Sequence, residues 1–134
     1  MEELEIDLSG RLGATTETST QQLTLYIPDR DRRGEELGTQ RSWVLQAANL
    51  LARIGGGVTI LPPVEGGWFD PDGPVIVWER PVLVYTFVDP DRLVELLPEL
   101  RAFLHRMGER TEQGEVIVEF DGSLYRISAF EATP

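Results

Sequence analysis

The residues best suited to chemistry in this sequence are aromatic and charged side chains around one expected hairpin. Trp68 and Trp78 flank a turn over residues 70–73, and the spacing allows the two indoles to approach each other across the hairpin. Glu79 and Arg80 follow Trp78 directly. Aromatic walls with a few charged groups are typical of a small-ligand pocket. The same residue types are enriched at interfaces between chains, and we favour the interface of the two.

Side chains from other segments are expected to join this group. Tyr26 lies on a strand that we expect beside residues 82–88, whose outward-facing side chains are large and apolar. Polar residues before and after the hairpin are expected to converge on the same side. The predicted ligand or interface residues are Tyr26, Thr59, Glu65, Trp68, Trp78, Glu79, Arg80, Leu83, Tyr85, Phe87 and Gln113.

The sequence supplies little for acid–base or metal chemistry. Its one histidine, His105, is expected half-exposed beside the apolar stripe of a helix, which is more typical of a surface residue than of a catalytic one. The chain has no cysteine and no lysine, so thiol nucleophiles, Schiff-base lysines and the usual zinc sites are excluded. Residues 70–73 are more typical of a turn than of a cation site. We predict no catalytic residue, no metal site and no cofactor.

The composition is that of one acidic globular domain. The 134 residues are 41% hydrophobic, and 23 acidic residues against 12 arginines give a net charge of −11. Such a surface disfavours nucleic acid and anionic membranes and is compatible with a basic protein partner. There is no apolar run of about 18 residues, and the N-terminus is acidic where a signal peptide would be basic. We therefore expect a cytoplasmic protein with no membrane partner.

The stretch over residues 55–89 is expected to organise the fold. Its second strand, predicted over residues 75–88, is apolar on both faces from Val82 to Val88, and such a strand must be covered on both sides. Pro81 predicts a bend in this strand, and residues 62–63, both proline, break the preceding strand at 58–61.

The remaining elements follow from hydrophobic period and capping signals. Residues 1–21 are predicted to be a flexible arm, in which alternation over residues 4–8 allows a short edge strand. Strands are expected over 23–27, 115–120 and 124–127. One helix runs from a Thr39 cap to Ile54 and ends in the glycines at 55–57. A second begins at Pro90 and reaches Met107, and Pro98 is expected to split it.

In order, these elements are strand, helix, strand, strand, helix, strand and one extra strand. The double β-α-β order predicts a ferredoxin-like α+β domain over residues 22–134, with an antiparallel sheet and both helices on one face. The other face of the sheet is left open.

Three short motifs resemble a loose group of small, uncharacterised bacterial ferredoxin-like proteins. They are the glycines at 55–57 followed by Val58-Thr59, the Gly67-Trp68 pair, and Gln113-Gly114-Glu115-Val116. The resemblance covers roughly residues 22–127, implies a ferredoxin-like fold and supplies no activity or catalytic residue. More distantly, the layout is similar to trimeric signalling proteins of the nitrogen-regulatory type and to dimeric α+β-barrel proteins.

We therefore expect a non-catalytic binding module that forms a homo-oligomer through its open sheet face and binds a protein partner or a small ligand. One alternative is an enzyme of the dimeric α+β-barrel kind, with acid–base work by Tyr26, Glu79, Arg80 or His105. Another is an acidic inhibitor or immunity-type protein that occludes a basic site. Within one chain, the N-terminal arm or the final hairpin over residues 124–130 would be the cover for the open face.

Overall fold

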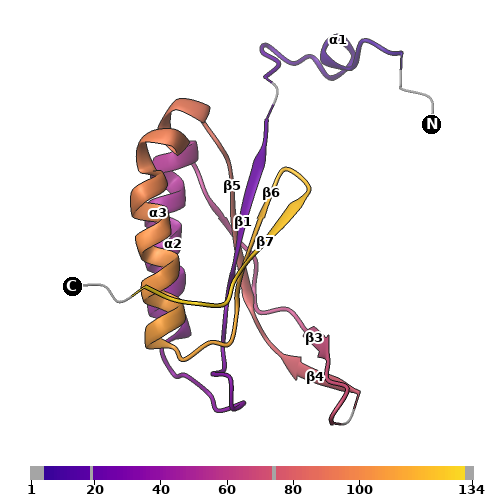
Figure 1. Ribbon diagram of the computed structural model, residues 1–134. Coiled ribbons are helices and arrows are strands. Elements are labelled where there is room, and N and C mark those ends of the chain that lie inside the picture. The colour runs from indigo at the N-terminus through magenta and orange to yellow at the C-terminus, as the bar shows by residue number, and fades with distance from the viewer. Residues whose placement is uncertain (1–4, 19, 74, 132–134) are drawn as a thin grey trace.

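The computed structural model describes residues 5–18, 20–73 and 75–131. Two long helices lie together on one face of an antiparallel sheet, and a small hairpin and a short helix project from opposite ends of it (Figure 1). The elements are α1 (Leu8–Leu12), β1 (Gln22–Ile27), α2 (Gln40–Gly55), β2 (Thr59–Ile60), β3 (Gly66–Phe69), β4 (Ile76–Glu79), β5 (Val82–Phe87), α3 (Pro90–Arg110), β6 (Val116–Phe120) and β7 (Ser123–Ile127).

The main sheet has five strands in the order β2-β5-β1-β6-β7, and each neighbouring pair is antiparallel. The predicted α+β class, with an antiparallel sheet and two helices on one face, is confirmed. The segment predicted as one strand over residues 75–88 is two strands in two sheets, because β4 pairs only with β3. Pro81 separates them, and the Arg80 N–H donates to the carboxylate of Asp29 at 3.0 Å.

The core lies between the sheet and the helix layer. Alternate residues of β1 and β5 face the helices, and Leu25, Ile27 and Val84 have no exposed surface. From α2, Leu51 and Ile54 pack into the same cluster and are also fully buried. This alternation follows the period-two side-chain geometry of strands, so one face of each central strand is apolar and enclosed.

The glycines at the end of α2, Gly55 and Gly56, have different structural roles. Gly56 has a φ of +87°, and its N–H bonds to the Ala52 carbonyl at 2.7 Å, which confirms the predicted glycine cap. A Cβ atom at Gly55 would collide with the Thr86 hydroxyl, so glycine lets the helix end approach β5. At the other end Thr39 is the N-cap residue, but its side chain makes no capping hydrogen bond.

The predicted break of the second helix at Pro98 is wrong. α3 is continuous over Pro90–Arg110 with Pro98 inside it. The proline and its neighbour Leu97 lie on the exposed side of the helix, where carbonyl groups tilt toward water and a missing N–H is tolerated best. Asp89 caps the first turn by accepting from the N–H groups of Asp91 and Arg92.

The N-terminal arm contains a helix where alternation allowed an edge strand. Asp7 caps α1 by accepting from the Gly10 N–H at 3.1 Å, and Gly13 ends it in the left-handed conformation. Residues 1–4, which include Leu4 of the expected edge strand, lie outside the described residues, as does Ser19 of the expected flexible segment. No helix in the described ranges is long and apolar enough to cross a membrane.

Neither predicted cover lies over the open sheet face in the described part of the chain. β7 extends the sheet beside β6 instead of folding across it. Phe130 turns to the opposite side and packs against Gly108 of α3, where a Cβ atom would collide with its ring. α1 buries none of its residues. Within the described ranges, no segment of the chain therefore covers the open face.

Candidate functional site

The open face of the sheet carries a row of aromatic and polar side chains. Tyr26 lies opposite Leu83, Thr24 opposite Tyr85, and Gln22 opposite Phe87. The predicted outward direction of Leu83, Tyr85 and Phe87 is confirmed, since Val82, Val84 and Thr86 between them are buried. Phe87 is half exposed, and its ring meets that of Tyr85 edge-on with centroids 5.9 Å apart.

A tyrosine–carboxylate pair lies in the middle of this face. Glu119 of β6 is opposite Thr24, and its carboxylate accepts a hydrogen bond from the Tyr26 hydroxyl. Burial and then this hydrogen bond raise the pKa of Tyr26 to about 12. Tyr26 is therefore a protonated hydrogen-bond donor at neutral pH, and Glu119 is the group that accepts.

A hollow of about 310 Å³ opens where β4 gives way to β5. Its walls are Arg30, Glu65, Trp78, Glu79 and Arg80. Four of these are predicted ligand or interface residues that the structure brings together. The Trp78 side chain is 62% exposed, so an aromatic face is available beside the charged groups.

Backbone contacts from three segments hold the hollow in place. The Asp29 carboxylate accepts from the Arg80 N–H, and the Gln40 side chain donates to the Arg80 carbonyl at 3.0 Å. Gln113 donates to the carbonyl of Arg30 at 2.7 Å. Gln113 thus acts through the position of Arg30 and does not line the hollow itself.

The charges in the hollow are only partly satisfied. Arg30 lies 3.6 Å from Asp29 and 3.7 Å from Glu36. Among the described residues, neither Glu79 nor Arg80 has an oppositely charged atom within 4.0 Å. Burial, and then the nearby charge of Asp29, raises the pKa of Glu79. The hollow therefore offers a desolvated carboxylate and a guanidinium to a ligand.

Two other predicted ligand or interface residues, Trp68 and Thr59, do not line this hollow. Trp68 pairs with Val77 while Trp78 pairs with Gly67, so the two indoles point to opposite faces of the hairpin and their predicted approach is wrong. A Cβ atom at Gly67 would collide with Trp78 and Ile76, so this glycine lets their side chains lie across the hairpin. Thr59 is exposed on edge strand β2, opposite Tyr85.

His105 is buried, which corrects the prediction of a half-exposed surface histidine. Only 6% of the residue is exposed. Its Nδ1 atom accepts from the backbone N–H of Glu131 at 2.9 Å, and its ring meets Phe130 edge-on. The C-terminal segment, whose course along α3 the sequence pattern did not predict, covers it. These two contacts with His105 therefore hold the C-terminal segment against α3.

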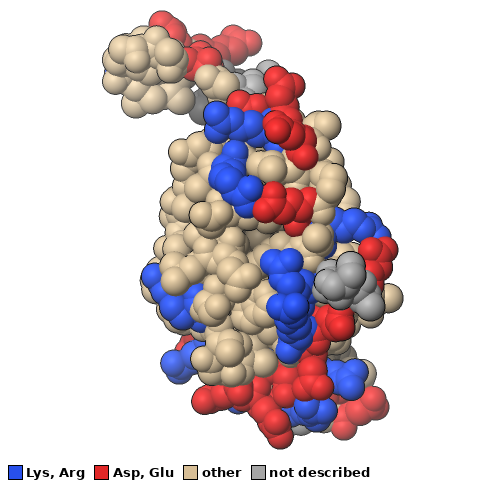
Figure 2. Space-filling model, turned by 90° about the vertical axis from the view of Figure 1, so that its left-hand side faces the viewer, with Lys and Arg blue, Asp and Glu red and all other residues tan. Residues whose placement is uncertain are grey.

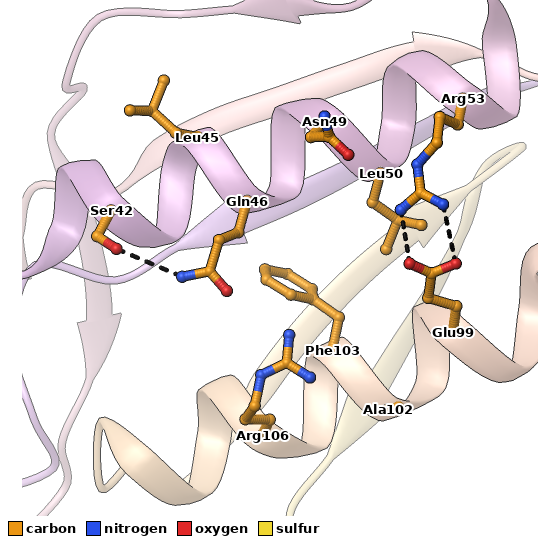
Figure 3. Close-up of a pocket in the computed structure, with 10 residues that line it drawn as sticks. All are labelled: Ser42, Leu45, Gln46, Asn49, Leu50, Arg53, Glu99, Ala102, Phe103 and Arg106. Carbon is orange, nitrogen blue, oxygen red and sulfur yellow. Dashed lines mark hydrogen bonds and ion pairs between the residues drawn. The ribbon is translucent and has the colours of Figure 1, made fainter.

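A second hollow, of about 600 Å³, lies between α2 and α3 on the opposite side of the molecule (Figure 3). At one end, Arg53 forms a bidentate ion pair with Glu99. At the other end, the guanidinium carbon of Arg106 lies 5.7 Å from the ring centre of Phe103. Figure 2 shows this side, where uncharged residues occupy much of the middle and basic side chains border them. The hollow is lined by Ser42, Leu45, Gln46, Asn49, Leu50, Arg53, Glu99, Ala102, Phe103 and Arg106.

Sequence reasoning missed Arg30 and Glu119. Extending the observed pairing of Ile27 with Val82 by three residues places Arg30 opposite Glu79, so a strand register would have found it. Alternation along β6 places Glu119 on the open face. No group of three acidic or histidine residues in the described ranges could hold a metal ion.

Comparison with known proteins gives a likeness of fold. No family model and no curated protein sequence matches the chain. A phage SAM lyase in complex with S-methyl-5'-thioadenosine superposes with a TM-score of 0.59 at 13% identity, covering 86% of this chain and 95% of that chain. A phage SAM lyase in the apo state has a TM-score of 0.50 at 16% identity, covering 85% and 91%. The chain is thus similar in fold, over nearly its whole length, to small phage enzymes.

Proposed function

We propose that this protein is a self-associating, non-catalytic binding module for a small ligand, and that the ligand enters the hollow beside Trp78. The observation that carries the proposal is a pair of opposite charges, Glu79 and Arg80, next to an exposed indole. Among the residues that the structure describes, neither has an oppositely charged atom within 4.0 Å. Glu79 would attract a cationic group, Arg80 would take a carboxylate, and Trp78 would stack on a flat or cationic part. A ligand that bears both charges and a ring fits all three.

The fold likeness narrows the ligand class. One neighbour holds S-methyl-5'-thioadenosine and is named for SAM, S-adenosylmethionine. S-Adenosylmethionine has a sulfonium and an ammonium cation, a carboxylate and an adenine ring, which match the groups of the hollow. Methylthioadenosine has the adenine but neither the amino acid nor the sulfonium. We therefore choose adenosyl-sulfur compounds as the first ligands to test.

The self-association follows from the bare sheet face. On this face Phe87 is half exposed, and Leu83 and Tyr85 are partly exposed. Fully burying a large apolar side chain contributes roughly 1.5–3 kcal/mol, so covering this patch would recover part of that amount for each residue, and a contiguous apolar patch on a protein usually marks an interface. The strand order β2-β5-β1-β6 also supports a ferredoxin-like core, into which the β3–β4 hairpin is inserted. A second copy on the open face would place the ligand at a subunit junction.

Calorimetric titration of the full chain with S-adenosylmethionine and with methylthioadenosine tests the ligand. We expect S-adenosylmethionine to bind, and Arg80→Ala and Trp78→Ala to weaken binding at least tenfold. Arg92→Ala, an exposed arginine at the start of α3, is the matched control and should bind as the wild type does. Ligand binding should also raise the melting temperature. Absence of heat and of a thermal shift with both compounds would refute the proposal.

A second candidate is the enzyme alternative, which the Tyr26–Glu119 pair on the open face favours. In that enzyme, the Glu119 carboxylate would hold the sulfonium of S-adenosylmethionine, and the Tyr26 hydroxyl would position the Glu119 carboxylate. The test is chromatography of S-adenosylmethionine incubated with the protein, where activity appears as methylthioadenosine. Release by the wild type that is lost in Glu119→Gln would replace the binding module by an enzyme, whereas unchanged S-adenosylmethionine would dismiss the enzyme.

A further inference from the structure

We propose that α1 of one copy packs into the groove between α2 and α3 of a second copy, as an exchanged arm. The proposal joins two features on opposite sides of the molecule that the ligand site does not use. One is a capped helix that buries nothing, and the other is an open groove with an apolar floor. It is independent of which ligand the protein binds.

The helix α1 lacks the contacts that would hold it. It has only five residues, and helices this short are unstable in water without tertiary packing. Yet it has a side-chain cap at Asp7 and a left-handed glycine at its end. Its apolar side chains are turned to solvent, with Leu8 53% and Leu12 71% exposed. Because these leucines are four residues apart, they form one apolar edge.

The groove has the form that an amphipathic helix requires. Leu50, Ala102 and Phe103 form the floor between the two helices, where Leu50 and Phe103 are almost fully buried. Leu45 is half exposed at the rim, on the side of α2 away from α3 (Figure 3). Its volume of about 600 Å³ leaves room for several side chains. Laying the apolar edge of a helix into such a groove is a recurrent mode of recognition.

Charge favours the groove over the β3–β4 hairpin, which is another exposed apolar surface. Residues 1–13 contain four acidic residues and one arginine. Residues 65–80, which include the hairpin, also contain four acidic residues and one arginine, so the two would repel each other. The groove is bordered by Arg53 and Arg106, with Glu99 as its only acidic lining residue. Of these two surfaces, the groove is the one that offers the acidic arm a positive charge, chiefly from Arg106 because Arg53 is paired with Glu99.

The position of α1 favours the groove of a second copy over that of its own chain. Eight residues separate Gly13 from Gln22, enough to span at most about 30 Å. In Figure 1, α1 stands clear of the helix layer of its own chain, on the side toward which the open face turns. The arm would meet the groove of a second copy whose helix layer faces it, which is a contact separate from the packing of two open faces.

Disulfide trapping tests the exchange, because the natural chain has no cysteine. Full-length Leu12→Cys carrying a mass tag is mixed with untagged Leu45→Cys under mild oxidation. We expect a mixed covalent dimer that forms at least tenfold faster than with Val94→Cys, a matched control that is exposed on α3 outside the groove. In the Leu45→Cys partner, Arg53→Glu with Arg106→Glu should slow the reaction.

Two outcomes would overturn the proposal. One is equal trapping at Leu45→Cys, Val94→Cys and Ile76→Cys, the last being on the hairpin, since this shows random collision. The other is a chain with both Leu12→Cys and Leu45→Cys that closes on itself as a covalent monomer, since the arm then occupies its own groove. The readout involves no ligand, so a failure here leaves the proposed binding function untouched.

Discussion

The two faces of the five-stranded sheet are built from alternate residues of the same strands, yet their surroundings differ completely. On the helix side, Leu25 and Val84 have no exposed surface. On the other side, Phe87 is 50% exposed, and a polar pair, Tyr26 and Glu119, lies among the apolar residues. The comparison separates two tasks: the enclosed face supplies the buried apolar area that stabilises the fold, whereas the open face and the hollow at its end are the surfaces that we propose for recognition.

The largest effect expected from this comparison is on unfolding. Leu25→Ala removes a fully buried side chain and should lower the free energy of unfolding by about 2–5 kcal/mol. Leu83→Ala makes the same change on the partner strand, on the open face, and should cost about 1 kcal/mol in the isolated chain. Urea unfolding at low protein concentration measures both. Equal losses would show that the two faces are not different in kind.

A second test addresses self-association. Phe87→Glu places a charge on the bare face, and we expect the dissociation constant of the oligomer to rise at least tenfold, about 1.4 kcal/mol, because burying an unpaired charge is costly. Sedimentation at micromolar concentration gives the value. Val94→Glu, on the exposed side of α3, should leave the oligomer unchanged. If the wild-type chain sediments as a monomer, the proposed self-association through the open face is wrong.

A third, smaller effect is a pH dependence from the open face. The pKa of Tyr26 is about 12 in the folded chain, above the ordinary tyrosine value of about 10. Because the folded state keeps its proton longer, this group contributes stability below about pH 10 and loses it as the pH rises toward 12. Near-ultraviolet absorbance should show a late phenolate step that is missing in Tyr26→Phe. A titration identical in the two proteins would contradict the hydrogen bond to Glu119.

The smallest effect belongs to the surface of the helix layer. Arg53 and Glu99 are each about half exposed, and such pairs contribute about 0.2–1 kcal/mol. Arg53→Ala should therefore change the free energy of unfolding only slightly, and the difference should shrink in high salt. Thermal unfolding at two salt concentrations measures it. A loss as large as that of Leu25→Ala would mean that charge, and not apolar burial, stabilises the helix-covered side.

The elements with a clear hydrophobic period were predictable from the sequence. The alternation in residues 23–27 and 82–88 is the signature of strands with one enclosed face, and the apolar stripe of α2 with its glycine cap is equally local. The inward and outward sets of β5 were assigned correctly for this reason. Period and capping therefore predicted the α+β class and which residues of β5 lie on the bare face.

The errors arose where tertiary packing overrides a local rule. Pro98 should end a helix by its own chemistry, but the packed stripes on either side of it hold α3 together. His105 looked half exposed because nothing local reveals that Phe130 and Glu131 return across it. In the hollow, Glu65, Trp78, Glu79 and Arg80 were predicted from their chemistry, whereas Arg30 needed a strand register that only the folded sheet supplies.

Pro98 also divides α3 into two parts that we expect to open at different rates. Without an N–H group, it cannot bond to the Val94 carbonyl, so the first two turns are tied to the rest of the helix by fewer hydrogen bonds. These turns are also less enclosed than the rest of α3: Leu93 and Leu96 contact the core but are only partly buried, and Val94 is 69% exposed, whereas Phe103 and Met107 further on are buried. Residues 90–97 should therefore open as a separate unit. Their amide protons should exchange with solvent faster than those after Leu100, without global unfolding.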